Sequence, residues 1–403
     1  MAIIHRNLCD PIIWALNEVF NQGRYTDKVL ERVLKEDKRR GARDRAFIAE
    51  NVYEIVRWRR LLGFCIGIDK ETGFTQMELW KLFGAQIVLA GMELPKWVEF
   101  APLDDKDIRK NRKSHKSRAV EQSVPDWMDT LGEKELGPVW GRELMALNQK
   151  ATLVVRCNLL KTTPDHVAKS LLELEVPTEF DERFPHALIL KKRINLFSTD
   201  LFKNGHVEVQ DAASQAVSAF LDVKPGMRVV DACAGAGGKS LHLSALMQNK
   251  GRIIALDTGE RRLDELRKRA ARAGADNIEA RIIDGAKTVK RMEKSADRLL
   301  LDVPCSGLGV LRRNPDAKWK LSQEEIERVK GIQREILTKY PVMLKPGGIM
   351  VYATCSILPS EGEDQIAWFL KENPDYKLLA EKRLSVAKDG FDGFYMAKLQ
   401  LGE

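Results

Sequence analysis

Two cysteines of the chain lie in surroundings that suit chemistry. Cys305 stands in the run LDVPCSGLGV and Cys355 in YATCSILPSEGEDQ, each just after an apolar, strand-like stretch and among small polar residues. The thiolate form of cysteine is the nucleophile, and it needs an activating environment because an ordinary cysteine is only a few per cent ionised at pH 7. These two residues are therefore the candidate nucleophiles of the sequence.

The other cysteines carry no such signal, because free cysteines are most often small buried hydrophobic residues. The six cysteines of the chain are widely separated and form no CxxC pair. We therefore expect reduced thiols of a cytoplasmic protein, with neither a disulfide framework nor a bound metal. The cysteines expected to be buried are Cys9, Cys65, Cys157 and Cys233.

A glycine-rich loop, DACAGAGGKS (231–240), follows one strand-like run and opens a helix. Its glycines allow a ligand to approach the backbone and expose the amide groups of the helix N-terminus. A phosphate-binding P-loop, GxxxxGK[ST], would require glycine where the chain has Cys233, and a strict GxGxxG pattern fails as well. The loop therefore predicts a ligand without a dominant phosphate group.

Three aspartates end the strand-like runs around this loop. Asp257 comes 19 residues after Gly238, where an acidic residue binds ribose hydroxyls in nucleotide-binding folds, and Asp284 and Asp302 end the next two runs. A single aspartate at such a position is often a turn former or helix cap, but three around one glycine loop favour a nucleoside cofactor, with S-adenosylmethionine the best candidate. The expected cofactor contacts are Ala232, Cys233, Ala234, Gly235, Ala236, Gly237, Gly238, Lys239, Asp257, Asp284 and Asp302.

The elements that must position these residues alternate between strands and helices from about residue 222 onward. Such alternation predicts a doubly wound, mostly parallel sheet, whose ligands bind beyond the carboxyl ends of the strands. A small α+β unit is expected before it, and residues 1–100 are expected to be helical, with Ile48, Val52, Ile55 and Leu62 on one helical face. The run 104–118 is almost free of apolar residues and is predicted to be a basic linker.

The composition limits the classes of protein that this chain can represent. Of 403 residues, 44% are hydrophobic and 31% are charged, which excludes a disordered chain, and the net charge is +8. No run of 18 apolar residues predicts a transmembrane helix, and the first residues do not resemble a signal peptide. The modest positive charge permits basic faces that bind a polyanion.

Several motifs together resemble one protein family. The PCSG and TCS motifs, the glycine loop, QDAASQ (210–215) and DGFYMAKL (392–399) resemble those of the Sun/RsmB family of RNA 5-methylcytosine methyltransferases. RDRAFIAENVYEIVRWRRLL (43–62) resembles the NusB-like helical domain of the RsmB branch. The loop departs from the family's C-A-A-P-G-G-K at Gly235 and Ala236, and losing the proline makes it less rigid.

The resemblance implies three domains and a fold. These are an all-α, NusB-like RNA-binding domain with the basic linker (1–125), a small α+β domain similar to an RRM (126–205), and a catalytic domain (206–403). The catalytic domain is expected to have the Rossmann-like α/β fold of class I S-adenosylmethionine-dependent methyltransferases.

The resemblance also implies roles for the reactive residues. Carbon 5 of cytosine is a poor nucleophile, and a thiolate that adds to carbon 6 turns the ring into an enamine that can accept a methyl group. By resemblance, Cys355 is this nucleophile and Cys305 assists release of the methylated RNA. DNA methyltransferases use the proline-cysteine motif instead, so the assignment depends on the TCS motif. Asp302 is placed to hydrogen-bond ring nitrogen 3, which would require a carboxyl held protonated. The target base must leave its stack.

RNA is the expected partner, bound by basic residues that can contact phosphates. Candidates are Lys110, Arg112 and Lys113 in the basic run, and Arg312, Arg313 and Lys318 after the PCSG motif. The NusB-like front favours small-subunit (16S) ribosomal RNA over tRNA. The alternatives are a tRNA cytosine-5 methyltransferase and a non-catalytic RNA-binding or ribosome-assembly factor with a decayed methyltransferase domain. We expect a monomer without membrane attachment.

Overall fold

The computed structural model describes residues 4–115 and 117–403. Its contacts divide the chain into two compact units. Unit 1 extends to Gln149 and also includes Leu311–Gln323, and unit 2 comprises Lys150–Val310 and Glu324–Glu403. The segment that directly follows the PCSG motif therefore belongs to the N-terminal unit. The expected division at residues 125 and 205 stays a prediction.

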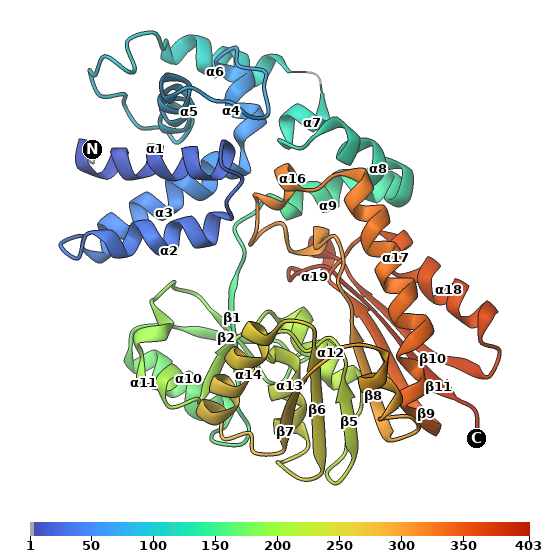
Figure 1. Cartoon of the computed structure of the whole chain (residues 1–403). Coiled ribbons are helices and arrows are strands. Elements are labelled where there is room, and N and C mark those ends of the chain that lie inside the picture. Colours follow the sequence, from blue (N-terminus) through green and yellow to red (C-terminus); the bar gives the residue numbers. More distant parts are fainter. Residues whose placement is uncertain (1–3, 116) are drawn as a thin grey trace. The chain divides into compact units, whose positions relative to one another are not determined.

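Unit 1 is all-helical in the described residues, as the sequence predicts (Figure 1). Its core contains Ile48, Val52, Ile55 and Leu62, none more than 1% exposed. Leu62 lies on a separate helix from the other three, because the chain turns at Trp58. The helices are α1 (Arg6–Phe20), α2 (Thr26–Glu36), α3 (Ala42–Arg57), α4 (Arg59–Cys65), α5 (Gln76–Leu89), α6 (Asp105–Ser114), α7 (Arg118–Glu121), α8 (Asp126–Leu136), η1 (Gly137–Val139), α9 (Trp140–Leu147) and α16 (Ala317–Lys320).

The expectation of a basic linker over 104–118 is wrong, because α6 occupies most of it. The Asp104 side chain accepts hydrogen bonds from the backbone N–H groups of Lys106 (2.7 Å) and Asp107 (3.1 Å) and so caps the helix. Arg112 and Lys113 in the last turn complement the helix dipole, and Ile108 is buried in the core of unit 1. The buried Ile108, the Asp104 cap and the basic residues of the last turn together stabilise this charged segment as a helix.

The segment 311–323 is an anchor within unit 1. Lys318 is fully buried, and its ammonium donates to the carbonyl oxygens of Arg57 (3.0 Å) and Ser123 (3.2 Å) and to Asn148 Oδ1 (2.6 Å). Burial holds the pKa of Lys318 well below the ordinary lysine value. Arg312 is also buried, with 6% of its surface exposed. Buried cations cannot reach RNA phosphates, so the positions of Lys318 and Arg312 argue against their expected role in RNA binding.

Unit 2 contains a small antiparallel sheet with the strand order β2-β3-β1-β4. Val167 and Leu171 of the neighbouring helix pack with Val155 and Leu188 of the strands in one buried core. The elements are β1 (Leu153–Cys157), α10 (Pro164–Glu173), β2 (Thr178–Phe180), β3 (Ala187–Leu190), η2 (Leu196–Ser198), α11 (Asp200–Lys203) and β4 (Val207–Val209).

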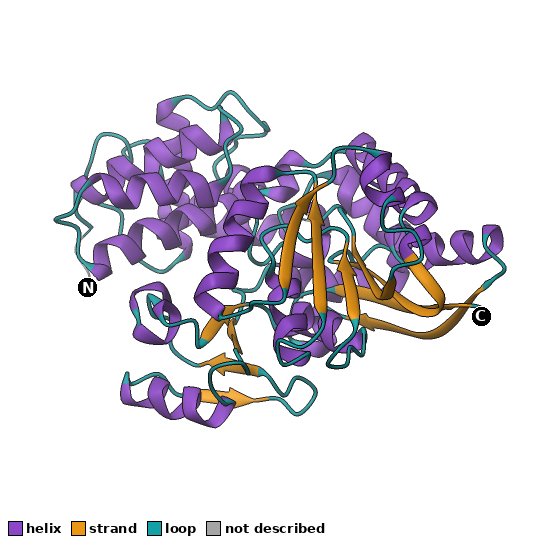
Figure 2. Ribbon diagram, turned by 60° about the horizontal axis from the view of Figure 1, so that its bottom comes forward, coloured by secondary structure: helices purple, strands orange, loops and turns teal. Residues whose placement is uncertain are grey.

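The larger sheet of unit 2 has seven strands among the described residues, in the order β10-β11-β9-β8-β5-β6-β7 (Figure 1). Figure 2 draws the strands in orange. Strands β9, β8, β5, β6 and β7 are parallel, and β11 and β10 add an antiparallel edge. This confirms the predicted mostly parallel α/β fold. The strands are β5 (Arg228–Asp231), β6 (Arg252–Asp257), β7 (Ile278–Ile282), β8 (Ala296–Asp302), β9 (Leu344–Thr354), β10 (Tyr376–Leu384) and β11 (Phe394–Leu401).

Both faces of this sheet are covered. Val230 and Leu299 belong to one buried cluster, whereas their chain neighbours Val229 and Leu300 belong to another, as expected for strands whose side chains alternate between two packed faces. The helices of this part are α12 (Ala212–Phe220), α13 (Gly238–Leu246), α14 (Glu260–Ala273), α15 (Ala286–Lys290), η3 (Leu308–Val310), α17 (Gln323–Lys339), η4 (Pro341–Met343), η5 (Pro359–Glu361), α18 (Glu363–Glu372) and α19 (Val386–Asp389). In the described residues, no helix combines the length and the hydropathy needed to span a membrane.

Candidate active site

The candidate residues meet at the carboxyl edge of the parallel strands. Asp231, Asp257 and Asp302 are the last residues of β5, β6 and β8, and Cys355 directly follows β9. These four strands are consecutive neighbours in the sheet, in the order β9-β8-β5-β6. The topology therefore brings together residues that are more than a hundred positions apart in the sequence.

The glycine loop links β5 to α13, and two of its glycines have left-handed backbone angles. Gly235 has φ +55° and Gly237 has φ +83°, a region that L side chains rarely adopt. At Gly237, a Cβ atom would lie 2.5 Å from Leu266 Cγ, so glycine also permits close packing against α14. At Gly235, the same atom would meet nothing within 4 Å. The loop is therefore open at Gly235, the position where a ligand could approach.

Asp257 holds this loop in place. It is 7% exposed, and it accepts hydrogen bonds from the backbone N–H groups of Gly235 (2.9 Å) and Gly259 (2.7 Å) and from Arg262 Nε (2.8 Å). The bond to Gly235 joins the loop to the end of β6. This contact restrains the loop where the family's proline is missing.

Asp231, which sequence reasoning did not single out as a site residue, is a buried carboxyl beside the loop. The Ser240 hydroxyl donates to its Oδ2 (2.6 Å), whereas Oδ1 has no hydrogen-bond partner among the described residues. Burial raises the pKa of Asp231 to about 6. A buried polar atom without a partner is costly, so Oδ1 is a place where a ligand could contribute a hydrogen bond.

Asp284 is exposed and follows Ile283, whose backbone N–H donates to the carbonyl oxygen of Asp257 (2.9 Å). It accepts a hydrogen bond from the Thr288 hydroxyl, which lowers the pKa of the carboxyl. A cavity of about 530 Å³ adjoins it, and its lining includes Ile283, Gly285 and Tyr340. Apolar side chains of this cavity, such as Ile283 and Tyr340, therefore lie close to Asp284 in the chain or in its lining.

Lys239 and Asp302 form an ion pair in the site. Lys239 Nζ lies 2.5 Å from Asp302 Oδ2, and the lysine side chain is 12% exposed. Burial alone would lower the pKa of Lys239, but the charges of Asp302 and Cys355 outweigh it and raise that pKa. Lys239 thus donates directly to the Asp302 carboxyl. The expectation that this carboxyl is held protonated stays a prediction.

The two candidate nucleophiles lie side by side. Cys305 Sγ and Cys355 Sγ are 3.4 Å apart, and both residues are half-buried. The pKa of Cys305 is raised well above the ordinary thiol value, first by its hydrogen bond to Cys355 and then by burial. Cys305 is therefore suited to remain a thiol, and either sulfur can donate in the contact between the two.

A buried glutamate, Glu361, joins the turns that carry the two cysteines. The backbone N–H of Ser306 (2.7 Å) and Gln333 Nε2 (3.0 Å) donate to its Oε1. The hydroxyls of Ser306 and Ser356 (2.5 Å for the latter) donate to its Oε2. Ser306 follows Cys305 and Ser356 follows Cys355, so one carboxylate fixes both turns.

Sequence reasoning missed Glu361 although the residue lies within the TCS-containing run. The run holds three acidic residues in close succession, Glu361, Glu363 and Asp364, and only the first is fully buried. Its burial depends on donors from α17 and from the PCSG turn, which are distant in the sequence. The only available signal was an acidic residue a few positions after a candidate nucleophile.

The predicted RNA-binding residues fall into two groups. Lys110 and Lys113 of α6 are exposed, and Arg112 is half-buried with its guanidinium 2.9 Å from His115 Nε2. Arg313 is half-buried and Arg312 is buried. Only the α6 residues thus present cations at the surface of a helix.

Comparison with known proteins identifies the family of this chain. Residues 218–400 match the family model "16S rRNA methyltransferase RsmB/F", and residues 124–196 match the ferredoxin-like domain of the same proteins. The chain is 33% identical over 398 residues to a probable ribosomal RNA small subunit methyltransferase B of Synechocystis sp., covering 90% of this chain and 88% of that protein. The corresponding Bacillus subtilis protein is 34% identical over 66% of this chain and 60% of its own length.

Solved structures show the same fold. The structure described as PH0851 superposes with a TM-score of 0.83 at 25% identity and covers 99% of both chains. A methyltransferase homolog from Pyrococcus horikoshii superposes with a TM-score of 0.63 at 27% identity, over 70% of this chain and 97% of its own. With the glycine loop, the strand-end carboxyls and the paired cysteines in place, the chain belongs to the RsmB/F family of small-subunit ribosomal RNA methyltransferases.

Proposed function

We propose that this protein is an S-adenosylmethionine-dependent RNA methyltransferase that forms 5-methylcytosine in 16S ribosomal RNA. The observation that carries the proposal is the pair of thiols 3.4 Å apart, at the strand edge that also holds the Lys239–Asp302 ion pair. Two adjacent thiols suit a reaction in which one attacks the base and the other handles a proton. The family membership supports ribosomal RNA as the substrate.

The residues around the glycine loop fit the cofactor. Asp231 Oδ1 is a buried acceptor without a partner, Gly235 leaves the loop open, and Asp257 ends β6 where ribose hydroxyls bind in this type of fold. Asp284 and the cavity beside it provide a wall for the adenine ring. When bound, S-adenosylmethionine supplies the methyl group. Asp231 would attract its positive charge, and Asp257 would hold its ribose.

The chain's own residues would act on the base as follows. The Cys355 thiolate adds to carbon 6 of cytosine, and the Lys239–Asp302 pair provides a hydrogen bond at ring nitrogen 3 as electron density moves there. Carbon 5 then takes the methyl group, and its proton passes to the Cys305 sulfur as the bond between carbon 6 and Cys355 breaks and the aromatic ring is restored. The Cys305 thiol lies close enough to return a proton to the leaving Cys355 sulfur, which would release the product.

The RNA substrate would be held by basic residues. RNA phosphates would contact the exposed cations of α6, and Arg313 stays a further candidate. The names of the relatives favour small-subunit ribosomal RNA over tRNA. We propose that the protein acts as a cytoplasmic monomer and needs no metal.

The test is a methylation assay with defined RNA. Purified protein would be incubated with labelled S-adenosylmethionine and either 16S ribosomal RNA or tRNA, both from cells that lack the gene. We expect label in 5-methylcytosine at one site of the 16S RNA, located by bisulfite sequencing and mass spectrometry. Label only in tRNA would favour the tRNA alternative. RNA binding without any methylation or cofactor binding would favour the decayed enzyme.

A further inference from the structure

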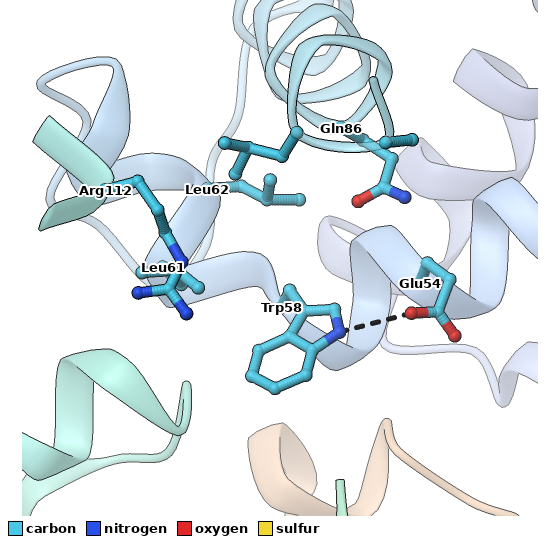
Figure 3. A pocket seen from close by; sticks show the side chains of 8 residues that line it. Glu54, Trp58, Leu61, Leu62, Gln86 and Arg112 are labelled. Atoms are coloured by element: carbon cyan, nitrogen blue, oxygen red, sulfur yellow. Dashed lines mark hydrogen bonds between the residues drawn. The ribbon is translucent and has the colours of Figure 1, made fainter. Parts of the chain in front are cut away.

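Unit 1 contains a cavity that the proposed chemistry does not use. Its volume is about 220 Å³, and it is lined by residues of α3, α4, α5 and α6 together with Trp58 between α3 and α4. Figure 3 shows Trp58, Gln86 and Arg112 around this space, each from a different element of the unit. Pockets for drug-sized ligands measure about 300–1,000 Å³, so this cavity suits a single ring system.

The lining combines a ring, an apolar wall and hydrogen-bonding groups. Leu61 and Leu62 form part of the wall, and the Trp58 indole donates to Glu54 Oε2 (3.1 Å). The side-chain amide of Gln86 is half-buried and makes no hydrogen bond to any described residue. Trp58 and the apolar wall suit a planar base, and Gln86 and Glu54 provide acceptors for an amino group on that base.

The charge around the cavity favours a nucleic acid strand as the ligand. The cavity itself would hold a base of that strand, while the phosphates stay outside. Arg112 lines the cavity, and α6 exposes Lys106, Arg109, Lys110 and Lys113 next to it, while its carboxylates lie in the first turn. The Glu54 carboxylate, which also pairs with Arg57 (3.4 Å), offers acceptor oxygens to the cavity and none of the donors that a phosphate needs. A strand could therefore place its backbone along α6 and one base in the cavity, as single-strand binding sites commonly do.

We propose that this cavity captures one unstacked nucleobase with an exocyclic amino group from RNA bound along α6. The inference rests on the proposed function, because it specifies how unit 1 would hold the RNA substrate. It gives unit 1 a contact that depends on the base in addition to the phosphate contacts of α6. Single-stranded or looped RNA would bind better than a chain of equal charge without bases.

The variant that tests this inference fills the cavity. Gln86→Phe introduces a ring where the amide faces the space, and Gln76→Phe makes the same replacement at the exposed start of the same helix as a matched control. The probes are an adenosine dodecamer, which cannot be a cytosine substrate, and an abasic dodecamer of equal charge. Fluorescence anisotropy would measure the affinity of the full chain for each.

We expect wild type and Gln76→Phe to bind the adenosine dodecamer more tightly than the abasic one. Gln86→Phe should lose roughly tenfold in affinity for the adenosine dodecamer, the size of one lost base stack, and nothing for the abasic one. Equal affinities of all three proteins for each probe would overturn the inference. An equal loss on both probes would overturn it too, because that result reports charge or folding.

A second measurement uses the unaltered protein. An adenosine dodecamer with a photoreactive azido group on its bases should cross-link to the peptides that contain Trp58 or Gln86, and cross-links confined to unit 2 would overturn the inference. Methylation of 16S RNA is assayed separately. If the enzyme methylates RNA but its affinity for the adenosine dodecamer does not depend on Gln86, only the cavity inference fails. If the protein binds RNA through the cavity but never methylates it, only the proposed function fails.

Discussion

Replacement of Glu361 should impair the chemical step more than it impairs cofactor binding. The carboxylate is fully buried and accepts four hydrogen bonds, from Ser306 N–H, the Ser306 and Ser356 hydroxyls, and Gln333. In Glu361→Ala the two hydroxyls, whose oxygens are 3.3 Å apart, can pair with each other. The Ser306 N–H then loses its acceptor, and the two cysteine turns lose their common tie.

The magnitude follows from these contacts. The four partners of Glu361 are neutral donors, and a buried donor left without its acceptor costs about 1–3 kcal/mol, so Glu361→Ala should destabilise unit 2 by about 2–4 kcal/mol. Glu361→Gln keeps one acceptor and gains a donor for a serine oxygen, so its cost should be about 1–2 kcal/mol. A displacement of a reacting group by about 1 Å can cost roughly 100-fold in rate. We therefore expect kcat to fall about 100-fold in Glu361→Ala and about tenfold in Glu361→Gln.

The assay is steady-state methylation together with urea unfolding. KM for S-adenosylmethionine should stay within about twofold of wild type, because the hydrogen bonds of the Glu361 carboxylate go to Ser306, Ser356 and Gln333 and thus lie outside the glycine loop. Glu363→Gln is the matched control: this residue, two positions later, pairs with Arg383 and should leave kcat unchanged. The reasoning is refuted if Glu361→Ala is destabilised yet keeps its kcat, or if Glu363→Gln loses as much activity.

Three further predictions concern other parts of the molecule. Asp257→Ala should weaken S-adenosylmethionine binding by about 1–3 kcal/mol in calorimetric titration and leave RNA affinity unchanged; an affinity within twofold of wild type would contradict the ribose assignment. Changing Lys110, Arg112 and Lys113 together to Ser should lower the log–log salt slope of RNA binding by roughly 0.7 for each lost phosphate contact, and an unaltered slope would remove α6 from the interface. Burial holds the pKa of His242 well below 6.5, so only the unfolded chain takes up this proton as pH falls. The free energy of unfolding should therefore fall by about 1.4 kcal/mol as the pH is lowered from about 7.5 to 5.5 because of this histidine. In His242→Gln, urea titrations should show a pH dependence that is smaller by this amount.

Much of the catalytic unit follows from local patterns in the sequence. The alternation of apolar runs with helical segments predicts the parallel sheet, and the topology of such a sheet brings strand ends to one edge. For this reason Asp257, Asp302, Cys305 and Cys355 could be named before the fold was known. The glycine pattern likewise located the loop, because its left-handed angles require that residue type.

What the sequence did not predict depends on long-range contacts. Lys318 and Arg312 look like surface cations, but their segment packs into unit 1, where Lys318 finds three buried acceptors. The partner of Asp302 in the site, Lys239, lies 63 positions earlier in the chain. The expected basic linker is a helix because a single buried residue, Ile108, anchors it. None of these partners can be identified by spacing.

The central claim, that Cys355 attacks the base and Cys305 releases it, is tested most directly by trapping on a denaturing gel. Wild type should form a covalent complex with RNA containing 5-fluorocytosine, whose fluorine blocks the final elimination. Cys355→Ala should form no complex and have no activity, whereas Cys305→Ala should accumulate a covalent complex on ordinary RNA because release is slow. A complex in Cys355→Ala and none in Cys305→Ala would contradict the account and assign the attack to Cys305.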